Sequence, residues 1–449
     1  MGDKNNTAEP LTPENQEVLN KYTIAAEISN RTSHVIHEGC VAFRKWDTYS
    51  DVLLFSLYIS NAAFVIFLSK SDYPGVLKKV VSAAVDGAKI IDLCKLGDKE
   101  IEDSVKVLFV KQKIPKGIGF PTCVSVNNII CHFSPLPSDP EAAATLKNGD
   151  LVKIQLGSHI DGYAAITATT FVVGATKENP VTGRKADVIT AAHLAAEAAA
   201  RLIKPGLPNM AVTETIQKIA REFDTNSLEG MLSHQLEKNE IEGKKQIILN
   251  PNEGQKREFE KIEFAENEVY GVDILISTGE GKPKNSHVRT TVYKKTDTTY
   301  SLKMKTSREV LNEIRTKFGS FPFPLSSLPD EKKARLGIQE CATHDLVSSY
   351  HVYQEKEDEY VAQFFFTIIL TKNGPLRITN TLYDPDVIKS DKKLEDEEII
   401  KLLATNLRPK KKNKKKKATA GEPSATSAEK GGDEENGVTT APGEAPGDE

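Results

Sequence analysis

The sequence DLVKIQLGSHIDGYAAITATTFVV, residues 150–173, predicts a β-hairpin on which the fold depends. Residues 151–156 alternate between apolar and polar side chains, which is the period of a β-strand. Residues 167–173 are rich in β-branched and aromatic side chains, which favour a second strand. Gly157, Asp161 and Gly162 lie between these runs and favour turns. We therefore expect two paired strands at the centre of the molecule.

The composition is typical of a large globular protein without a disulfide framework. Its 449 residues suffice for a sizeable core, in one large domain or several smaller ones. The five cysteines are odd in number and scattered, with no zinc-site spacing, which favours free thiols in a reducing compartment. The first ten residues are polar, so no secretory signal is predicted. The net charge is only −4 but is unevenly distributed.

The N-terminal region contains an anomaly. Residues 1–11 are polar and predict disorder, and residues 12–31 predict a helix with Thr12 as its N-cap. When residues 32–75 are removed, the apolar spacing of this helix continues from Ile28 to Val76. We interpret residues 32–75 as an insert, with a retained intron or a gene-model error as the leading explanation. A buried hairpin and a membrane anchor are the alternatives, but the apolar run at 52–68 is short for a bilayer span, so no membrane insertion is expected.

The rest of the chain predicts alternating helices and strands. Helices are expected over residues 76–88, 99–112, 185–203, 213–223, 306–318, 329–337, 340–346 and 389–406. Strands are expected over residues 123–133, 268–277, 290–300 and 360–371, with a strand or turn at 89–96 and a turn at Lys294 and Lys295. Three consecutive phenylalanines, Phe364, Phe365 and Phe366, predict a strand buried on both faces. Cys131 and His132 are neighbours in an expected strand and should point to opposite faces, which argues against a nucleophile pair.

Short motifs in a fixed order along the chain resemble those of type-two methionine aminopeptidases. They are GFPT at 119–122, LSH at 232–234, VYGVD at 269–273, STG at 277–279 and YVAQF at 360–364. Four others resemble the proliferation-associated, ErbB-receptor-binding proteins, which are non-catalytic relatives of those enzymes. These are VTGRKADVI at 181–189, EGMLSHQL at 229–236, LKMKTSR at 302–308 and DEKKAR at 330–335. The resemblance implies an α/β pita-bread fold of the creatinase/aminopeptidase type over residues 76–405, with a central curved, mostly antiparallel sheet and flanking helices. A basic loop, 237–261, and a helical subdomain, 301–346, belong to it.

The same resemblance defines five positions at which the aminopeptidases bind two metal ions. Here these positions hold Gln155, Ile166, His234, Asp273 and Phe365. Two divalent ions require several anionic ligands, and an amide and two apolar side chains do not supply them. We therefore expect no metal, no cofactor and no catalytic residue. His132 matches a substrate-contacting histidine of the enzymes and is expected in a vestigial pocket, and Glu242 stands at the second such histidine.

Two basic segments are candidates for binding RNA or ribosomes. Residues 408–417 contain one arginine and seven lysines, and the following 418–449 is rich in Gly, Pro, Ala and Glu, so 406–449 is expected to be a disordered tail. Clustered lysines neutralise phosphates without reading sequence. A solvated tail, a nuclear address and a plain solvated loop are the competing interpretations. The candidate residues are Lys244, Lys245, Lys256, Arg257 and Lys261 in the loop, and Lys410, Lys411, Lys412, Lys414, Lys415, Lys416 and Lys417 in the tail.

The function that the resemblance implies is that of a non-catalytic, RNA-binding and ribosome-associated regulator of translation, ribosome biogenesis and growth. Its expected location is the cytoplasm, nucleus and nucleolus. Its expected partners are the large ribosomal subunit near the exit tunnel, and also receptor cytoplasmic domains and transcriptional repressors, with a corepressor role. Two alternatives stay open: an active metal-dependent aminopeptidase with an altered site, and a pure protein-interaction scaffold.

Overall fold

The central hairpin is present and is longer than the sequence predicts. The computed structural model describes residues 12–30 and 75–408, which lie within one unit, Met1–Pro409. Strands β3 (Leu151–Ile160) and β4 (Tyr163–Val172) pair along their whole length. Asp161 and Gly162 form the turn with φ angles of +53° and +86°, which suits the short connection between antiparallel strands.

Gly157 was wrongly expected in the turn. It lies inside β3 opposite Ile166. A Cβ atom at Gly157 would come within 2.9 Å of Ile166 Cγ1, so the glycine makes room for the neighbouring strand. Its role is close packing within the sheet, which sequence-based turn propensity does not distinguish from a turn.

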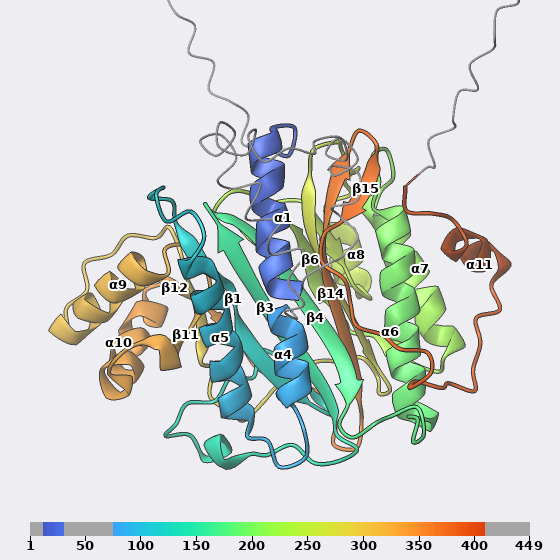
Figure 1. The fold of residues 1–449 in the computed structure, drawn as a ribbon, viewed down its shortest axis with the longest axis horizontal. Coiled ribbons are helices and arrows are strands. Elements are labelled where there is room, and N and C mark those ends of the chain that lie inside the picture. Colours follow the sequence, from blue (N-terminus) through green and yellow to red (C-terminus); the bar gives the residue numbers. More distant parts are fainter. Residues whose placement is uncertain (1–11, 31–74, 409–449) are drawn as a thin grey trace, which may run out of the picture. The chain divides into compact units, whose positions relative to one another are not determined.

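The hairpin belongs to a nine-stranded antiparallel sheet (Figure 1). Its main path runs in the order β1 (Lys116–Val126), β3, β4, β14 (Val361–Thr371), β8 (Val269–Ser277), β6 (Leu232–Gln235) and β7 (Gln246–Ile248). At its side, β15 (Gly374–Arg377) pairs with β14, and β5 (Asn226–Ser227) pairs with β8. The curved antiparallel sheet with flanking helices is therefore confirmed.

Helices cover the two halves of this sheet separately (Figure 1). On the β1–β3–β4 half lie α1 (Gln16–Asn30), α4 (Val76–Ala83) and α5 (Ile90–Lys106). On the β14–β8 half lies α6 (Gly183–Leu202), and α7 (Asn209–Glu222) and α11 (Glu397–Leu403) pack against α6. Eleven residues of α6 are buried, eight of them alanines, so the helix approaches the sheet closely.

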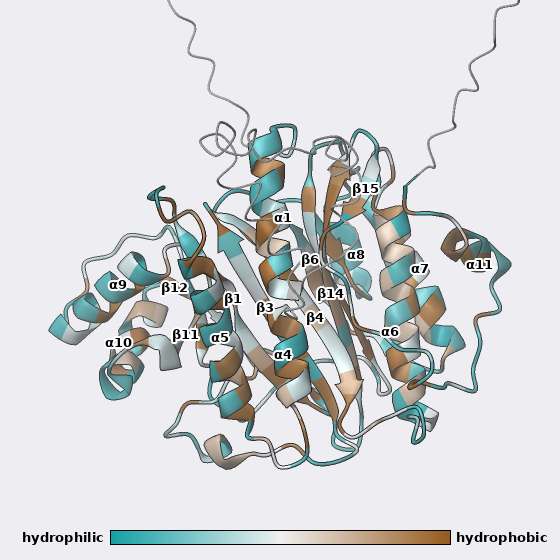
Figure 2. Ribbon diagram, in the orientation of Figure 1, coloured by the Kyte–Doolittle hydropathy of each residue, from teal (hydrophilic) through white to brown (hydrophobic). Residues whose placement is uncertain are grey.

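Strand β14 is buried on both faces, as its three phenylalanines predict. Phe364 and Phe366 are 0% exposed on the side of α6, and Phe365 is 8% exposed on the other side. Figure 2 shows β14 as mainly hydrophobic, in contrast to the hydrophilic helix α8 (Glu253–Glu258).

A helical subdomain lies beyond the β1 edge of the sheet. Helices α9 (Lys305–Lys317) and α10 (Glu331–Thr343) pack on each other around their own apolar cluster. The sheet of β11 (Phe323–Pro324), β10 (Val292–Lys295) and β12 (Val347–Tyr350) joins them. The third sheet consists of β2 (Ile129–Cys131), β13 (Tyr353–Gln354) and β9 (Lys284–Asn285). Two short 3-10 turns, Pro140–Ala143 and Leu325–Ser327, complete the elements.

Several predicted boundaries are wrong. Residues 89–96 form no strand, because Ile90, Leu93, Cys94 and Ile101 share one buried face of the single helix α5. The two helical pieces at 329–337 and 340–346 are one helix, α10, which Asp330 caps at its N-terminus. The last helix is only α11, since it begins after the cap residue Asp396. Lys294 and Lys295 lie within β10 and form no turn.

The first helix begins at Gln16, later than expected. Residues 12–15 form a turn, in which the Asn15 amide donates to the Thr12 carbonyl at 3.0 Å. The Asn15 side chain accepts a hydrogen bond from the Glu17 amide at 2.9 Å, which is the role of an N-cap. The insert expected at residues 32–75 lies outside the described residues apart from Gly75, and the segments predicted to be disordered, 1–11 and 406–449, lie outside them apart from residues 406–408. Within residues 12–30 and 75–408, no helix has the length and apolar character of a membrane span.

Candidate functional site

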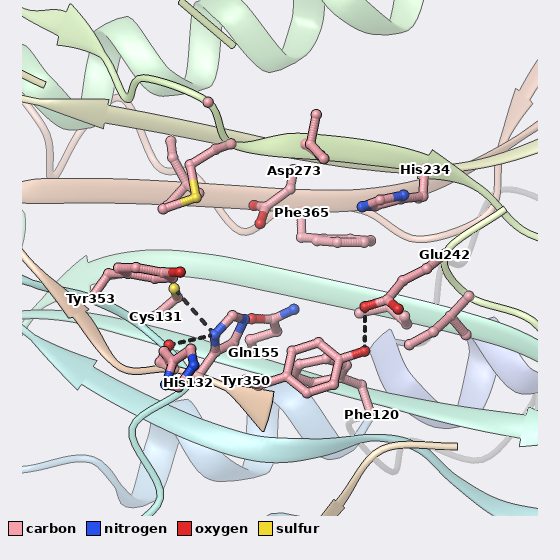
Figure 3. Close-up of a pocket in the computed structure, with 18 of the residues that line it drawn as sticks. Phe120, Cys131, His132, Gln155, His234, Glu242, Asp273, Tyr350, Tyr353 and Phe365 are labelled. Atoms are coloured by element: carbon pink, nitrogen blue, oxygen red, sulfur yellow. Dashed lines mark hydrogen bonds between the residues drawn. The ribbon is translucent and has the colours of Figure 1, made fainter. Parts of the chain in front are cut away.

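One cavity of about 310 Å³ gathers the five ligand positions and His132 (Figure 3). Gln155 on β3 and Ile166 on β4 point to the same face of the hairpin, because Gln155 lies opposite Ala168 and Ile166 lies opposite Gly157. Asp273 on β8 faces Phe365 on β14, and His234 on β6 lies opposite Gly271 on β8. In Figure 3, Asp273, Phe365 and His234 form one wall and Gln155, His132 and Tyr350 the opposite wall.

The carboxylate of Asp273 is held by an amide. The Gln363 Nε2 atom donates to Asp273 Oδ1 at 2.9 Å and to Oδ2 at 3.1 Å, and it lies 3.5 Å from Gln155 Oε1. Burial raises the pKa of Asp273 to about 7, and the Gln363 hydrogen bond only partly opposes that shift. Gln363 was not predicted as a site residue. The period of two along a strand identifies it, since Gln363 and Phe365 point to the same face.

Burial favours the neutral form of His132 and His234, two of the three histidines that line the cavity. Burial lowers the pKa of His132 to about 4, and burial also lowers the pKa of His234. The His132 Nδ1–H donates to the His351 carbonyl at 3.0 Å, so its Nε2 atom is left as an acceptor. His234 Nδ1 is buried and has no hydrogen-bond partner among the residues that the structure describes.

The expected separation of Cys131 and His132 is wrong. Strand β2 ends at Cys131, and His132 adopts a φ of +64°, which turns both side chains to the same side. Cys131 Sγ lies 3.4 Å from His132 Nδ1. Burial raises the pKa of the Cys131 thiol well above its usual range, and the nearby Asp273 adds to this shift. The pair therefore remains a neutral thiol and a neutral imidazole, which is no activated nucleophile.

Glu242 connects the cavity to the basic loop 237–261. The Lys294 Nζ atom lies 2.8 Å from both Glu240 Oε1 and Glu242 Oε2, and the Tyr350 hydroxyl donates to Glu242 Oε1 at 2.6 Å. Burial opposes ionisation of Glu242, but Lys294 outweighs it and holds the pKa of this carboxyl below its usual value. The cluster fastens the start of the loop to β10 and β12.

The side chains at the five positions do not fit a pair of divalent metal ions. The Gln155 amide faces Gln363, Ile166 and Phe365 offer no donor atom, and Asp273 already accepts two hydrogen bonds. In the part of the chain that the structure describes, no group of three or more His, Cys, Asp or Glu side chains is placed to hold a metal ion. No chemical step through a metal follows from this arrangement.

The five basic residues of the loop that are expected to bind RNA fall into two groups. Lys245 pairs with Glu268 at 2.5 Å and Lys256 pairs with Glu253 at 2.8 Å, so both serve local structure. Lys244, Arg257 and Lys261 are exposed on the loop. The loop is partly ordered by β7 and by α8, which starts in a capping box of Asn252 and Gln255. The lysines from 410 to 417 lie outside the described residues.

Comparison with known proteins identifies the class and then the family. Residues 76–280 match Metallopeptidase family M24. A solved structure titled "Structure of a thermophilic Arx1" aligns with a TM-score of 0.73 at 33% identity, covering 88% of this chain and all of that one. The class is therefore the M24 pita-bread fold.

Two curated relatives specify the family. The "Curved DNA-binding protein" of Schizosaccharomyces pombe is 49% identical over 334 residues, covering 74% of this chain and 87% of the relative. "ERBB-3 BINDING PROTEIN 1" of Arabidopsis thaliana is 45% identical over 340 residues, covering 75% and 83%. The chain belongs to the family of ErbB-3-binding and proliferation-associated proteins.

Proposed function

We propose that this protein is a nucleic-acid-binding, ribosome-associated regulator of translation, ribosome biogenesis and growth, with the peptidase-like fold as a non-catalytic scaffold. Its proposed location is the cytoplasm, nucleus and nucleolus. The observation that carries the proposal is the contrast in charge between the two candidate regions. The cavity positions are mainly neutral, whereas Lys244, Arg257 and Lys261 are exposed on one loop.

Charge and kinship both support nucleic acid as the partner. Exposed cations bind phosphates and release counterions without requiring a sequence-specific surface. Seven lysines between residues 410 and 417 add a second cationic segment. A relative that is 49% identical carries the name "Curved DNA-binding protein", which describes nucleic-acid binding by that relative.

The proposed partners are RNA and the large ribosomal subunit near the exit tunnel. Receptor cytoplasmic domains and transcriptional repressors are further proposed partners, because relatives are named for binding ErbB-3. The first prediction of the proposal is salt-dependent binding of RNA and cosedimentation with ribosomes.

The dependence of RNA affinity on salt tests the proposal. We expect neutralisation of the loop in the triple variant Lys244→Gln, Arg257→Gln, Lys261→Gln to lower the slope of log affinity against log salt, by about 0.7 for each phosphate of a single strand that the protein no longer neutralises. Deletion of residues 408–449 should lower it further. The matched control is Lys78→Gln, Lys95→Gln, Lys99→Gln, which removes three exposed charges from α4 and α5. An unchanged slope in both the loop variant and the deletion would exclude these segments as phosphate-binding regions.

Two other experiments separate the alternative functions. A working aminopeptidase predicts stoichiometric metal in the purified protein together with turnover of an N-terminal methionine peptide, and such turnover overturns the non-catalytic assignment. A pure protein-interaction scaffold predicts no affinity for RNA at any salt concentration. Sedimentation of ribosomes with the wild type, with the loop triple variant and with the deletion of residues 408–449 distinguishes the RNA-binding function from the scaffold function in one assay.

A further inference from the structure

We infer that the cavity between β3, β6, β8, β14 and β12 binds a neutral, planar heteroaromatic ring, namely a base of a single-stranded nucleic acid. This inference rests on the proposed function for the source of the base. It gives the cavity a ligand class different from a charged peptide terminus. Three properties of the cavity support it: its charge, its walls and its hydrogen-bonding groups.

The charges around the cavity are compensated. Glu242 is bound by Lys294 and Tyr350, each with one hydrogen bond to its carboxylate. Gln363 caps Asp273, and His132 is neutral at physiological pH. Among the described residues, no exposed lysine or arginine lines the cavity, so a phosphate gains nothing by entering it. The base is the neutral part of a nucleotide, and the cavity accordingly selects it over the phosphate.

The walls present aromatic rings at different orientations. Phe120 and Tyr350 meet edge to face with their centroids 5.5 Å apart, and Tyr350 meets His132 in the same way at 5.2 Å. Phe365 lies on the opposite wall (Figure 3). The cavity of about 310 Å³ has the volume of about ten water molecules, which suffices for a one- or two-ring base but not for a folded strand. Aromatic side chains bind unstacked bases in this manner.

The polar groups of the cavity match the mixed edge of a base. His132 Nε2 is an acceptor because Nδ1 donates to the His351 carbonyl. Gln155 turns its oxygen toward Gln363 Nε2, which leaves its own amide N–H groups as donors. Within the described part of the chain, His234 Nδ1 is buried without a partner. A base carries both donors and acceptors on its edge, so one ring can use these groups together.

The position of the cavity allows a strand to supply the base. Ile241 and Glu242 line the cavity and belong to the basic loop 237–261. Exposed Lys244 follows two residues later. The phosphates can therefore contact the loop outside while one base occupies the cavity. Stacking of one base increases affinity by about tenfold or more.

The experiment compares two single-stranded RNA oligonucleotides of equal length and charge on the full-length protein. One carries 2-aminopurine at its centre, and the other carries an abasic residue there. The blocking variant is Ser349→Trp, because Ser349 lines the cavity from β12. The control is Ser348→Trp on the same strand, because Ser348 is exposed and does not line the cavity. Circular dichroism melting verifies that both variants fold.

We expect the wild type and Ser348→Trp to bind the base-bearing strand about tenfold tighter than the abasic strand and to change the 2-aminopurine fluorescence. Ser349→Trp should lose both effects and still bind both strands in a salt-dependent manner. Equal affinity of the wild type for the two strands would overturn the inference and leave the proposed function standing. If Ser348→Trp and Ser349→Trp change the strand affinities and the 2-aminopurine fluorescence equally, the assignment of base binding to this cavity is overturned.

Titration with free 2-aminopurine riboside distinguishes a failure of the base-binding inference from a failure of the proposed function. If neither strand binds at any salt concentration, the proposed function fails. If the wild type then binds the riboside and Ser349→Trp does not, the cavity is a base site for free nucleosides. That result overturns the assignment of the ligand to a nucleic-acid strand. If the riboside also fails to bind, the cavity takes no base.

Discussion

The cavity and the basic loop share Ile241 and Glu242, but charged side chains are paired in the cavity and exposed on the loop. Inside the cavity, Glu242 is paired with Lys294 and Tyr350, and Asp273 is capped by Gln363. On the loop, Lys244, Arg257 and Lys261 are exposed to solvent. An unpaired charge is costly in a buried site and costs little on the surface. The fold therefore fixes the charge state of the cavity, and the cations of the loop remain available to a partner.

The largest effect is expected where the sheet supports the cavity. Phe364→Ala in β14 removes a ring that is 0% exposed and should lower the free energy of unfolding by about 3–5 kcal/mol, because the site cannot collapse around the gap. Urea denaturation measures this change in the free energy of unfolding. The control Ile400→Ala alters a side chain that is 44% exposed and should change stability by less than about 0.5 kcal/mol. Similar losses in both variants would contradict the assignment of β14 to the core.

The next effect concerns the buried acid of the cavity. Folding raises the pKa of Asp273 from its ordinary 3.8 to about 7, so between these values the folded state holds more protons than the unfolded state. Stability should therefore be present at acidic pH and fall as pH rises toward 7. Asp98, whose pKa burial also raises to about 7, contributes in the same direction.

Asp273→Asn tests this dependence. The variant should be more stable than the wild type by about 1–3 kcal/mol at pH 8 and should lose that advantage near pH 4. Urea midpoints at the two pH values give the comparison. If Asp273→Asn and the wild type differ in stability by the same amount at both pH values, the proton affinity of Asp273 does not change on folding.

A smaller effect is expected at the junction of the two regions. Lys294→Met leaves Glu240 with only the hydrogen bond from the Glu242 amide, and Glu242 with only that from Tyr350, which should cost about 1–2 kcal/mol. Hydrogen exchange should accelerate in residues 237–245, because their attachment to β10 is lost. Lys295→Met is the control, since Lys295 faces the other way and pairs with fully exposed Asp297 at 3.8 Å. Equal protection in both variants would contradict the role of Lys294 as a fastening residue.

The smallest effect on stability is expected in the loop itself. The triple variant Lys244→Gln, Arg257→Gln, Lys261→Gln should shift the free energy of unfolding by less than about 0.5 kcal/mol per site, because the three side chains are exposed. Its thermal melting curve should match that of the wild type while its RNA affinity falls. A large loss of stability would show that these cations serve the fold.

Periodicity and motif order predicted much of the fold. The hairpin, β8, β14 and α6 follow from short-range patterns that tertiary contacts reinforce. Helix α5 was divided wrongly because Gly97 and Asp98 weaken its local helical pattern, whereas burial against β1 holds it as one helix. Gly157 was misplaced because turn propensity and close packing both favour glycine.

The site was predicted less completely than the fold. The five ligand positions were identified by resemblance, but the side chains that form hydrogen bonds around the cavity were not. Gln363 belongs to a motif whose role is set by a hydrogen bond across two strands, and Lys294 lies 52 positions from Glu242 along the chain. The approach of Cys131 to His132 depends on one positive φ angle, which period-two reasoning does not anticipate.

The sequence by itself determined the periodic elements, the family and the chemical types at the ligand positions, because each of these resides in the order of residues. Only the tertiary structure decided which groups are paired, which pKa values shift and which cations stay exposed. Those properties depend on burial and on distances between residues far apart in the chain, such as the 2.9 Å between Gln363 and Asp273. A hydrogen bond of that kind forms only when the sheet has brought its strands together.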